Sequence, residues 1–279
     1  MKTFIVDSFT NKAFKGNPAG VCILESSISD ELMLKITQEL GFSETAFVSS
    51  IEKSESLAIR FFTPKMEIPL CGHATLASAK VIFETTDVEH VEFINIQEIK
   101  LPIVSLNNKI LMRFPVYETT PSNVPEALLT ALGVTEIQNC AYNHETKILL
   151  LEIETADELS NLNPDYESLY KSHDSINGVL VTAKSEGEYD FHSRYFWPWS
   201  GTNEDPVTGA THTFLSKYWS ERLGKTKMKS FQSSSRTGFM EVEMDDNEVL
   251  ITGNAVIVFR GEFLISTLTK RITTNQQDK

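Results

Sequence analysis

An internal repeat restricts the fold of this 279-residue chain more than any other feature. Residues 60–64 read Arg-Phe-Phe-Thr-Pro, and residues 194–198 read Arg-Tyr-Phe-Trp-Pro. Each run is followed by a loop with a second proline, then by a glycine and a helical pattern rich in small residues. Chance is the alternative for five positions, but the order of strand, loop, glycine and helix recurs half a chain apart. We therefore predict a duplicated unit.

A duplicated α/β unit predicts two similar lobes whose equivalent loops face each other across one cleft, where ligand sites are common. Hairpins such as the one around residues 245–247 favour mixed or antiparallel sheets over a doubly wound fold. The predicted fold class is α+β, with two pseudo-symmetric lobes that each wrap a mixed or antiparallel sheet around a central helix. We assign residues 1–116 to the first lobe and residues 117–263 to the second, with a C-terminal strand at about 264–279 as a candidate to complete the first.

Local patterns place the individual elements. The expected strands lie at 2–8, 19–24, 57–63, 91–96, 102–106, 110–114, 146–153, 178–183, 189–197, 239–244, 248–252 and 255–264. The expected helices are 29–40, with Ser29 as N-cap and Gly41 as stop, 73–83, and 210–219 with an end near Gly224. Segments 123–126 and 155–158 resemble capping boxes that open short helices, and the turn-rich segment 117–125 is the expected linker.

Composition excludes several classes of protein. The formal net charge is −13, which opposes nucleic-acid binding, and the small basic cluster at Arg222, Lys225, Lys227 and Lys229 is interpreted as a solvated helix end. Three widely spaced cysteines indicate a reduced, cytoplasmic protein. The sequence shows neither a signal peptide nor a run of about 20 apolar residues, so we expect no membrane partner.

The first candidate for chemistry is Glu44, in Gly41-Phe-Ser-Glu-Thr-Ala-Phe-Val48. It follows a helix stop and precedes an apolar strand, between Phe42 and Phe47. Burial of a carboxylate disfavours its charged form and can make a glutamate an acid and base near neutral pH. On this fragment alone, a surface turn residue is the simpler interpretation.

The second candidate is Pro69-Leu-Cys-Gly-His-Ala74. A helix that begins at Gly72 presents free backbone N–H groups, which suit a carboxylate. His73 would then donate a proton or hold an acidic substrate, and the thiol of Cys71 at a helix start can have a lowered pKa. A structural histidine and a buried cysteine are an equally good interpretation of the fragment.

Two further loops complete the set. The repeat partner, Asn203-Glu-Asp-Pro-Val-Thr-Gly-Ala-Thr-His212, offers helix-start amides at Gly209 and an acid at Asp205, which otherwise merely caps the turn. Lys15-Gly-Asn-Pro-Ala-Gly20 is a strong turn former in which Asn17 could offer an amide to a ligand. Nucleotide, flavin and metal motifs are absent from the sequence, so the expected cofactor is none and the expected metal is none.

Together these fragments resemble the PhzF family of phenazine-biosynthesis isomerases, in the branch with animal phenazine biosynthesis-like domain-containing proteins. The resemblance spans nearly the whole chain and is carried by Asp7-Ser-Phe-Thr10, Phe14-Lys-Gly-Asn-Pro-Ala19, Phe42-Ser-Glu-Thr-Ala-Phe-Val48, Arg60-Phe-Phe-Thr-Pro64, Pro69-Leu-Cys-Gly-His-Ala-Thr75 and Glu204-Asp-Pro-Val-Thr-Gly209. It implies the diaminopimelate epimerase fold, a homodimer, no cofactor, and an active site between the lobes. The founding member of the family isomerises trans-2,3-dihydro-3-hydroxyanthranilate by moving a proton.

By this resemblance Glu44 is the catalytic acid and base, supported by His73 and Asp205. The implied substrate-binding residues are Asn17, Ser43, Cys71, Gly72, Gly209 and Ala210. Two departures bear on specificity. Ala210 stands where the founding enzyme has serine, and Thr208 stands where a two-thiol epimerase would have its second cysteine.

We therefore expect an isomerase that moves a proton on a small carboxylate. One alternative is a racemase or epimerase that uses Cys71 with Glu44, and another is a non-catalytic binding or scaffold protein that retains the fold.

Overall fold

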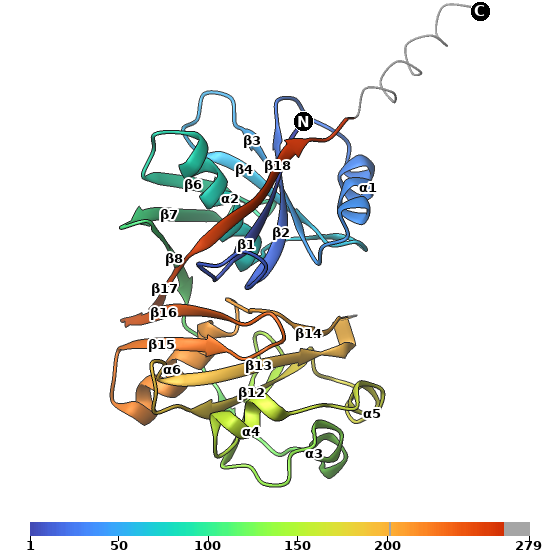
Figure 1. The fold of residues 1–279 in the computed structure, drawn as a ribbon, viewed down its shortest axis with the longest axis vertical. Helices are drawn as coiled ribbons and strands as arrows, with labels where there is room; N and C mark the ends of the chain where they lie inside the picture. Colours follow the sequence, from blue (N-terminus) through green and yellow to red (C-terminus); the bar gives the residue numbers. More distant parts are fainter. Residues whose placement is uncertain (201, 265–279) are drawn as a thin grey trace, which may run out of the picture.

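The computed structural model describes residues 1–200 and 202–264, which form two lobes stacked along the long axis (Figure 1). The elements of the first half are β1 (Lys2–Ser8), β2 (Asn17–Leu24), α1 (Asp30–Leu40), β3 (Thr45–Ser50), β4 (Leu57–Phe62), β5 (Glu67–Ile68), α2 (Gly72–Thr85), β6 (His90–Ile94), β7 (Lys100–Leu106) and β8 (Lys109–Pro115). Those that follow are β9 (Thr120–Pro121), α3 (Glu126–Leu132), β10 (Asn139–Asn143), β11 (Ile148–Glu152), α4 (Ala156–Asn161), α5 (Tyr166–Lys171), β12 (Gly178–Lys184), β13 (Phe191–Trp197), the 3-10 turn η1 (Pro198–Ser200), β14 (Thr202–Asp205), α6 (His212–Leu223), β15 (Lys227–Gln232), β16 (Gly238–Asp245), β17 (Glu248–Gly253) and β18 (Ala255–Glu262).

The strand pairing has the same pattern in both lobes. In the first lobe β2 pairs in parallel with β3 and β4 with β6, and in the second lobe β11 pairs in parallel with β12 and β13 with β15. The pairs β1–β2, β3–β4, β6–β7 and β7–β8 are antiparallel, as are β10–β11, β12–β13, β15–β16 and β16–β17. The predicted α+β class with mixed sheets and two pseudo-symmetric lobes is confirmed.

The lobes are joined by strands rather than by a free linker. β8 pairs with β17, so the two sheets are continuous (Figure 1). The predicted linker contains β9, which adds to β10, and β18 crosses back to pair with β1. The predicted second lobe, 117–263, therefore includes a strand that hydrogen-bonds to the first lobe, because only Asn254 separates β17 from β18. The strand expected at 264–279 lies outside the described residues apart from Leu264.

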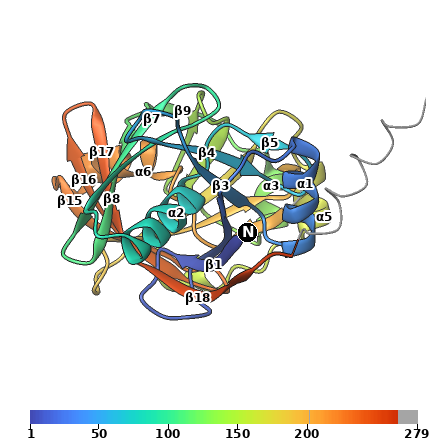
Figure 2. The ribbon, with the colours of Figure 1, turned by 90° about the horizontal axis from the view of Figure 1, so that it is seen from above.

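A central helix fills each lobe. α2 contacts β1, β2, β3 and β18, and Figure 2 shows it enclosed by first-lobe strands. Its alanines at 74, 77 and 79 are buried, which lets the sheet approach the helix closely. α6 packs against β15, β16 and β17, and its Trp219 stacks on Phe191 of β13 with ring centroids 5.6 Å apart.

Most predicted helix ends are confirmed. Ser29 caps α1 by accepting from the backbone N–H of Leu32, and Gly41 ends it in the left-handed region with φ +71°. Thr155 caps α4 in the same way. The capping box at 123–126 is wrong, because α3 begins only after Pro125, and a proline disfavours helical backbone in the residue before it. α6 begins at His212 rather than at residue 210.

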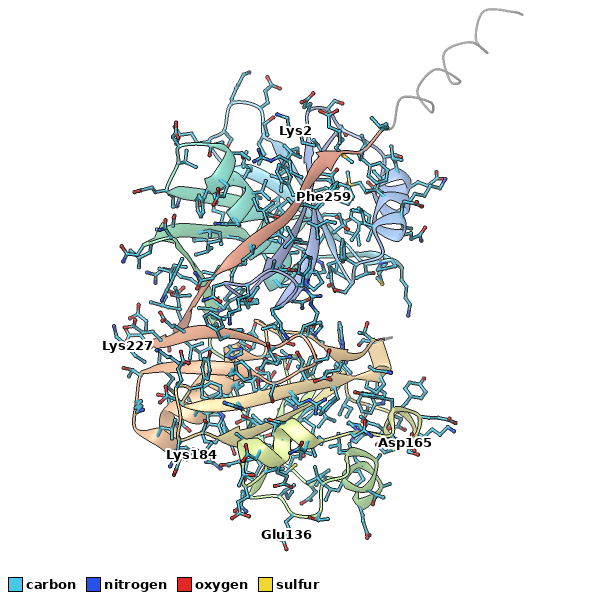
Figure 3. All side chains as sticks on the ribbon, in the orientation of Figure 1. Lys2, Glu136, Asp165, Lys184, Lys227 and Phe259 are labelled. Carbon is cyan, nitrogen blue, oxygen red and sulfur yellow. The ribbon has the colours of Figure 1, made fainter. Side chains whose placement is uncertain are left out.

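The basic cluster only partly forms a helix end. Arg222 lies in the last turn of α6 and pairs with Glu152, whereas Lys227 lies in β15 and pairs with Glu243. Lys227 projects from the surface of the second lobe, as Figure 3 shows. No helix within residues 1–200 and 202–264 is long and apolar enough to cross a bilayer.

The repeated motif builds the same ion pair twice. Arg60 of β4 donates to both carboxylate oxygens of Glu67 in β5, at 2.7 and 2.6 Å. Arg194 of β13 donates to both oxygens of Glu204 in β14, at 2.8 and 2.9 Å. Because strand, ion pair, loop and helix recur together, the repeat read from the sequence is a repeat of structure.

Candidate active site

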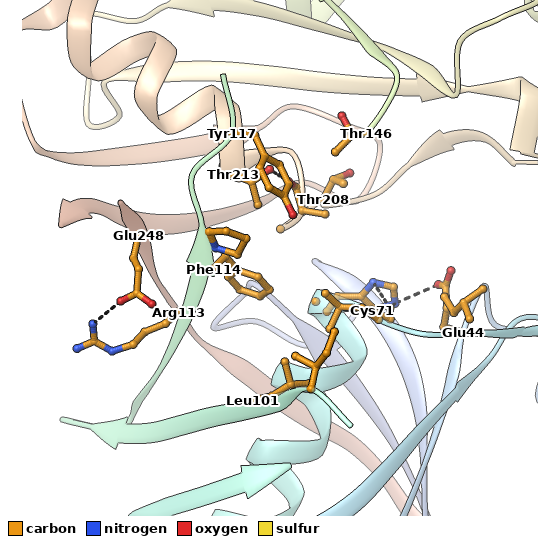
Figure 4. Close-up of a pocket in the computed structure, with 18 of the residues that line it drawn as sticks. Glu44, Cys71, Leu101, Arg113, Phe114, Tyr117, Thr146, Thr208, Thr213 and Glu248 are labelled. Atoms are coloured by element: carbon orange, nitrogen blue, oxygen red, sulfur yellow. Dashed lines mark hydrogen bonds and ion pairs between the residues drawn. The ribbon is translucent and has the colours of Figure 1, made fainter. Parts of the chain in front are cut away.

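A cavity of about 1010 Å³ lies between the lobes and takes its walls from both (Figure 4). The first lobe contributes the loop before β3 and the start of α2, and the second contributes β13, β14 and the turn before α6. Of the residues predicted from the sequence, the cavity is lined by Glu44, Cys71, Gly72, His73, Asp205, Gly209 and Ala210. The loops that the repeat predicted to be equivalent thus do face each other.

Glu44 is held in the short connection between α1 and β3. The left-handed Gly41 turns the chain out of the helix, and the carbonyl oxygen of Glu44 accepts from the backbone N–H of Gly20 at 3.3 Å. The residue is only 6% exposed, so it is not the surface turn residue of the simpler interpretation. Its carboxylate oxygen Oε2 lies 3.3 Å from Nε2 of His73, the contact drawn as a dashed line in Figure 4.

His73, in the first turn of α2, has a partner on each ring nitrogen. Nε2 faces Glu44, while Nδ1 lies 3.3 Å from the amide nitrogen of Asn17 and 3.5 Å from the sulfur of Cys71. Burial lowers the pKa of His73, and the charge of Glu44 partly offsets that effect. The thiol of Cys71 can donate to Nδ1, and a neutral imidazole that accepts there carries its proton on Nε2, directed at Glu44.

Asn17 lies behind the cavity rather than in its wall. It is fully buried, and its amide nitrogen donates to Oδ1 of Asp205 at 2.8 Å and to the carbonyl of Val207 at 2.9 Å. Both hydrogens of this amide are therefore used by the second lobe, and the imidazole of His73 only lies beside it. The oxygen Oδ1 of Asn17 has no hydrogen-bond partner among the described residues, and the sequence prediction that this residue offers its amide to a ligand stays a prediction.

Asp205 ends β14 on the opposite wall. It accepts from Asn17 and from the hydroxyl of Thr208, and burial, together with the charge of Glu44, raises its pKa to about 7. The two hydrogen bonds oppose this rise. At neutral pH the carboxyl of Asp205 thus exists in both protonated and ionised forms.

The thiol of Cys71 differs from the sequence expectation. It stands at the N-cap of α2, but burial and the neighbouring charge of Glu44 raise its pKa well above the usual value. The loss of water around the sulfur raises its pKa more than the backbone N–H groups at the helix start lower it. The sulfur therefore carries a proton at neutral pH. Thr208 occupies the equivalent place at the second helix start.

Glu44, Cys71 and His73 also bring three possible metal-ligand atoms within 4.8 Å of one another. Spacing along the chain did not predict this group, because Glu44 reaches it from a separate loop.

The two helix starts approach each other across the cavity. A Cβ placed on Gly72 would lie 4.0 Å from the backbone nitrogen of Ala210 and 3.8 Å from Phe114. Gly209 packs against the ring of Phe9, where a Cβ would approach to 3.0 Å. Ser43 is half-buried in the turn after α1 and is not among the residues that line the cavity.

Sequence reasoning missed the aromatic and apolar part of the wall, which includes Phe114, Tyr117, Ile148, Tyr195 and Trp197. For Tyr195 and Trp197 a clue was present, because they are two of the positions at which the repeat copies differ. The others come from β8 and β11 and from the segment after β8, whose patterns indicate only strand or turn.

The fold is that of the diaminopimelate epimerase-like class. The model of the PhzC-PhzF family of phenazine biosynthesis-like proteins matches residues 6–261, and the chain belongs to this family. It is 40% identical to phenazine biosynthesis-like domain-containing protein 2 of Mus musculus, over 92% of this chain and 97% of the mouse protein. It is also 40% identical to an uncharacterized isomerase of Halalkalibacterium halodurans, over 94% of this chain and 98% of the relative.

The crystal structure of a putative phenazine biosynthesis PhzC/PhzF protein from Clostridium difficile matches with a TM-score of 0.86 and 40% identity. The match covers 95% of this chain and all of that one.

Proposed function

We propose that this protein is a cofactor-independent isomerase that moves a proton on a small unsaturated carboxylate, with Glu44 as the acid and base. The observation that carries the proposal is the position of Glu44, a buried carboxylate in the wall of the interlobe cavity and 3.3 Å from the imidazole of His73. A relative at 40% identity is called an isomerase, which agrees with this class of reaction.

The substrate carboxylate would bind between the helix starts. The first N–H groups of a helix have no partner within the helix, and the helix dipole favours an anion there. Gly72 begins α2 and Ala210 lies in the turn before α6 on the facing side of the cavity, which supports a carboxylate held by backbone amides from both lobes.

The reaction proposed is an allylic proton shift. The carboxylate of Glu44 takes a proton from a carbon next to the unsaturated system, and the electron pair of the broken C–H bond moves the double bond along. Glu44, now protonated, returns the proton to the far carbon on the same face, so one group serves first as base and then as acid. The Nε2–H group of His73 donates to the carboxylate of Glu44 and holds it in position. The backbone amides near Gly72 and Ala210 stabilise the negative charge that develops on the substrate.

A racemase that uses Cys71 with Glu44 has less support. A second base must lose its proton at neutral pH, and the buried thiol of Cys71 has a raised pKa. The opposite helix start carries Thr208, whose hydroxyl is engaged by Asp205.

We further propose a homodimer in the cytoplasm. All three cysteines are buried and unpaired, which agrees with a reducing compartment. Light scattering coupled to size exclusion tests the dimer, and a mass near that of one 31.4 kDa chain would contradict it.

The test of the proposed function is solvent deuterium incorporation into small unsaturated carboxylates, trans-2,3-dihydro-3-hydroxyanthranilate among them. Wild type and Glu44→Gln are compared in the same buffer, with and without a chelator. Removal of the base is expected to slow exchange by about 10²–10⁴-fold, the range for a positioned acid and base. Equal exchange by both proteins would exclude Glu44, exchange that the chelator abolishes would exclude a metal-free reaction, and no exchange across the panel would favour a binding protein.

A further inference from the structure

The two copies of the repeat differ at positions that face the cavity. Arg60 and Arg194 are equivalent, so the next residue is Phe61 in β4 and Tyr195 in β13. Each has a cross-strand partner, and these are Ile68 in the first lobe and Asp205 in the second. The apolar pair Phe61 and Ile68 of the first lobe thus corresponds to the polar pair Tyr195 and Asp205 of the second. Both Tyr195 and Asp205 line the cavity.

A glycine makes room for this tyrosine. Arg60 pairs with Phe47 of β3 and Arg194 with Val181 of β12, and three residues before these stand Glu44 and Gly178. Gly178 is therefore the second-lobe counterpart of Glu44. A Cβ on Gly178 would lie 2.6 Å from the hydroxyl oxygen and from Cε2 of Tyr195. The φ of Gly178 is not in the left-handed region, so it is the ring of Tyr195 and not the backbone that requires glycine here.

The hydroxyl of Tyr195 consequently lies where the side chain of a residue equivalent to Glu44 would begin. The tyrosine is only 4% exposed, and burial together with the charge of Asp205 raises the pKa of its phenol. The group remains protonated at neutral pH and can both donate and accept one hydrogen bond.

We propose that the hydroxyl of Tyr195 contacts the substrate from the second lobe, opposite Glu44, and hydrogen-bonds a polar substituent other than the carboxylate. This inference rests on the proposed function for the location of the substrate. Tyr195 would then determine specificity, while Glu44 transfers the proton. The substrate would then carry a hydroxyl, amino or oxo group on the side that faces β13.

Binding of stable ring carboxylates tests the inference without turnover. The probes are 3-hydroxyanthranilate, which has two extra polar groups, and benzoate, which has none; calorimetry gives the Kd of each. Wild type should prefer 3-hydroxyanthranilate, and Tyr195→Phe should weaken its binding by about tenfold, as expected for one hydrogen bond in a buried site, while benzoate changes by less than about twofold. Gly178→Ala, which displaces the ring, should have the same selective effect.

Matched controls separate this role from general damage. Tyr218→Phe removes another buried tyrosine hydroxyl, one that donates to Glu152 outside the cavity, and Gly187→Ala adds a methyl group where the nearest atom is 4.0 Å away. Neither should alter the preference between the probes. An unchanged preference in Tyr195→Phe, an equal loss for both probes, or the absence of any preference in wild type would overturn the inference.

Failure here is distinguishable from failure of the proposed function. Glu44→Gln should keep the preference between the probes while it loses deuterium exchange. If Glu44→Gln still exchanges but Tyr195→Phe loses the preference, the proton-transfer proposal fails and the binding inference stands.

Discussion

The two walls of the cavity share one backbone plan and carry different chemistry. Both present a glycine at a helix start or in the turn before it, at Gly72 and Gly209, behind a strand with a bidentate arginine–glutamate pair. Three residues before the cross-strand partner of each arginine, however, the first lobe has Glu44 and the second has Gly178. The framework is symmetric, whereas the reactive groups are not.

This difference shows which parts of a duplicated unit are free to diverge. The ion pairs join neighbouring strands, and each arginine also lies over a phenylalanine ring, so a change there would leave a charged side chain without its partner. The side chains that line the cavity are not part of these ion pairs, since Glu44 contacts His73 and Asp205 accepts from Asn17 and Thr208. A single site can therefore take its base from one lobe and its neutral hydroxyl from the other.

The largest expected effect concerns Asp205, the second-lobe counterpart of Ile68. Asp205 has a pKa of about 7 in the folded protein against 3.8 ordinarily, so the folded state binds the extra proton between these pH values. This contribution makes the protein more stable as pH falls from about 7 to about 4, by an amount on the order of 4 kcal/mol. Asp205→Asn should remove this pH dependence of the free energy of unfolding, measured by urea titration at each pH, whereas Ile68→Asn should leave it in place. A wild-type profile that matches that of Asp205→Asn would contradict the raised pKa.

The next effect compares the two arginines. The side chain of Arg194 is 9% exposed and also donates to the carbonyls of Leu159 and Leu162, whereas that of Arg60 is 26% exposed and reaches the exposed Asp30. Loss of a buried pair leaves an uncompensated charge and costs about 3–5 kcal/mol, while a surface pair contributes about 0–1 kcal/mol, and the half-buried Arg60–Glu67 pair lies between these cases. Arg194→Met should therefore destabilise the protein by about 2 kcal/mol more than Arg60→Met in urea unfolding. Equal losses would show that burial does not distinguish the two copies.

The smallest effect concerns the helix starts. Cys71 is protonated and Thr208 has no thiol, so neither is expected to be a base. Cys71→Ser should slow deuterium exchange by less than about tenfold, because the change alters packing beside His73 but removes no proton carrier. Thr208→Ser serves as the counterpart in the second lobe. A loss of 10² or more in Cys71→Ser alone would restore the racemase alternative.

Sequence by itself determined the features that appear as residue patterns. The caps at Ser29 and Thr155 and the strand and helix periods follow from local hydrogen bonds, which are set within a few positions of the chain. The repeat was visible because two segments half a chain apart share one order of residue types, and the family resemblance singled out the loops that carry Glu44, His73 and Asp205.

Only the tertiary structure decided what depends on distant parts of the chain. Ser43 does not line the cavity, and Asn17 donates a hydrogen bond to Asp205, 188 residues away. Burial in the folded protein also raises the pKa of the Cys71 thiol, and β18 pairs with β1 of the first lobe. The physical reason is that burial and electrostatic environment are properties of the assembled walls, and the residues that create them lie too far apart in sequence to form a local pattern.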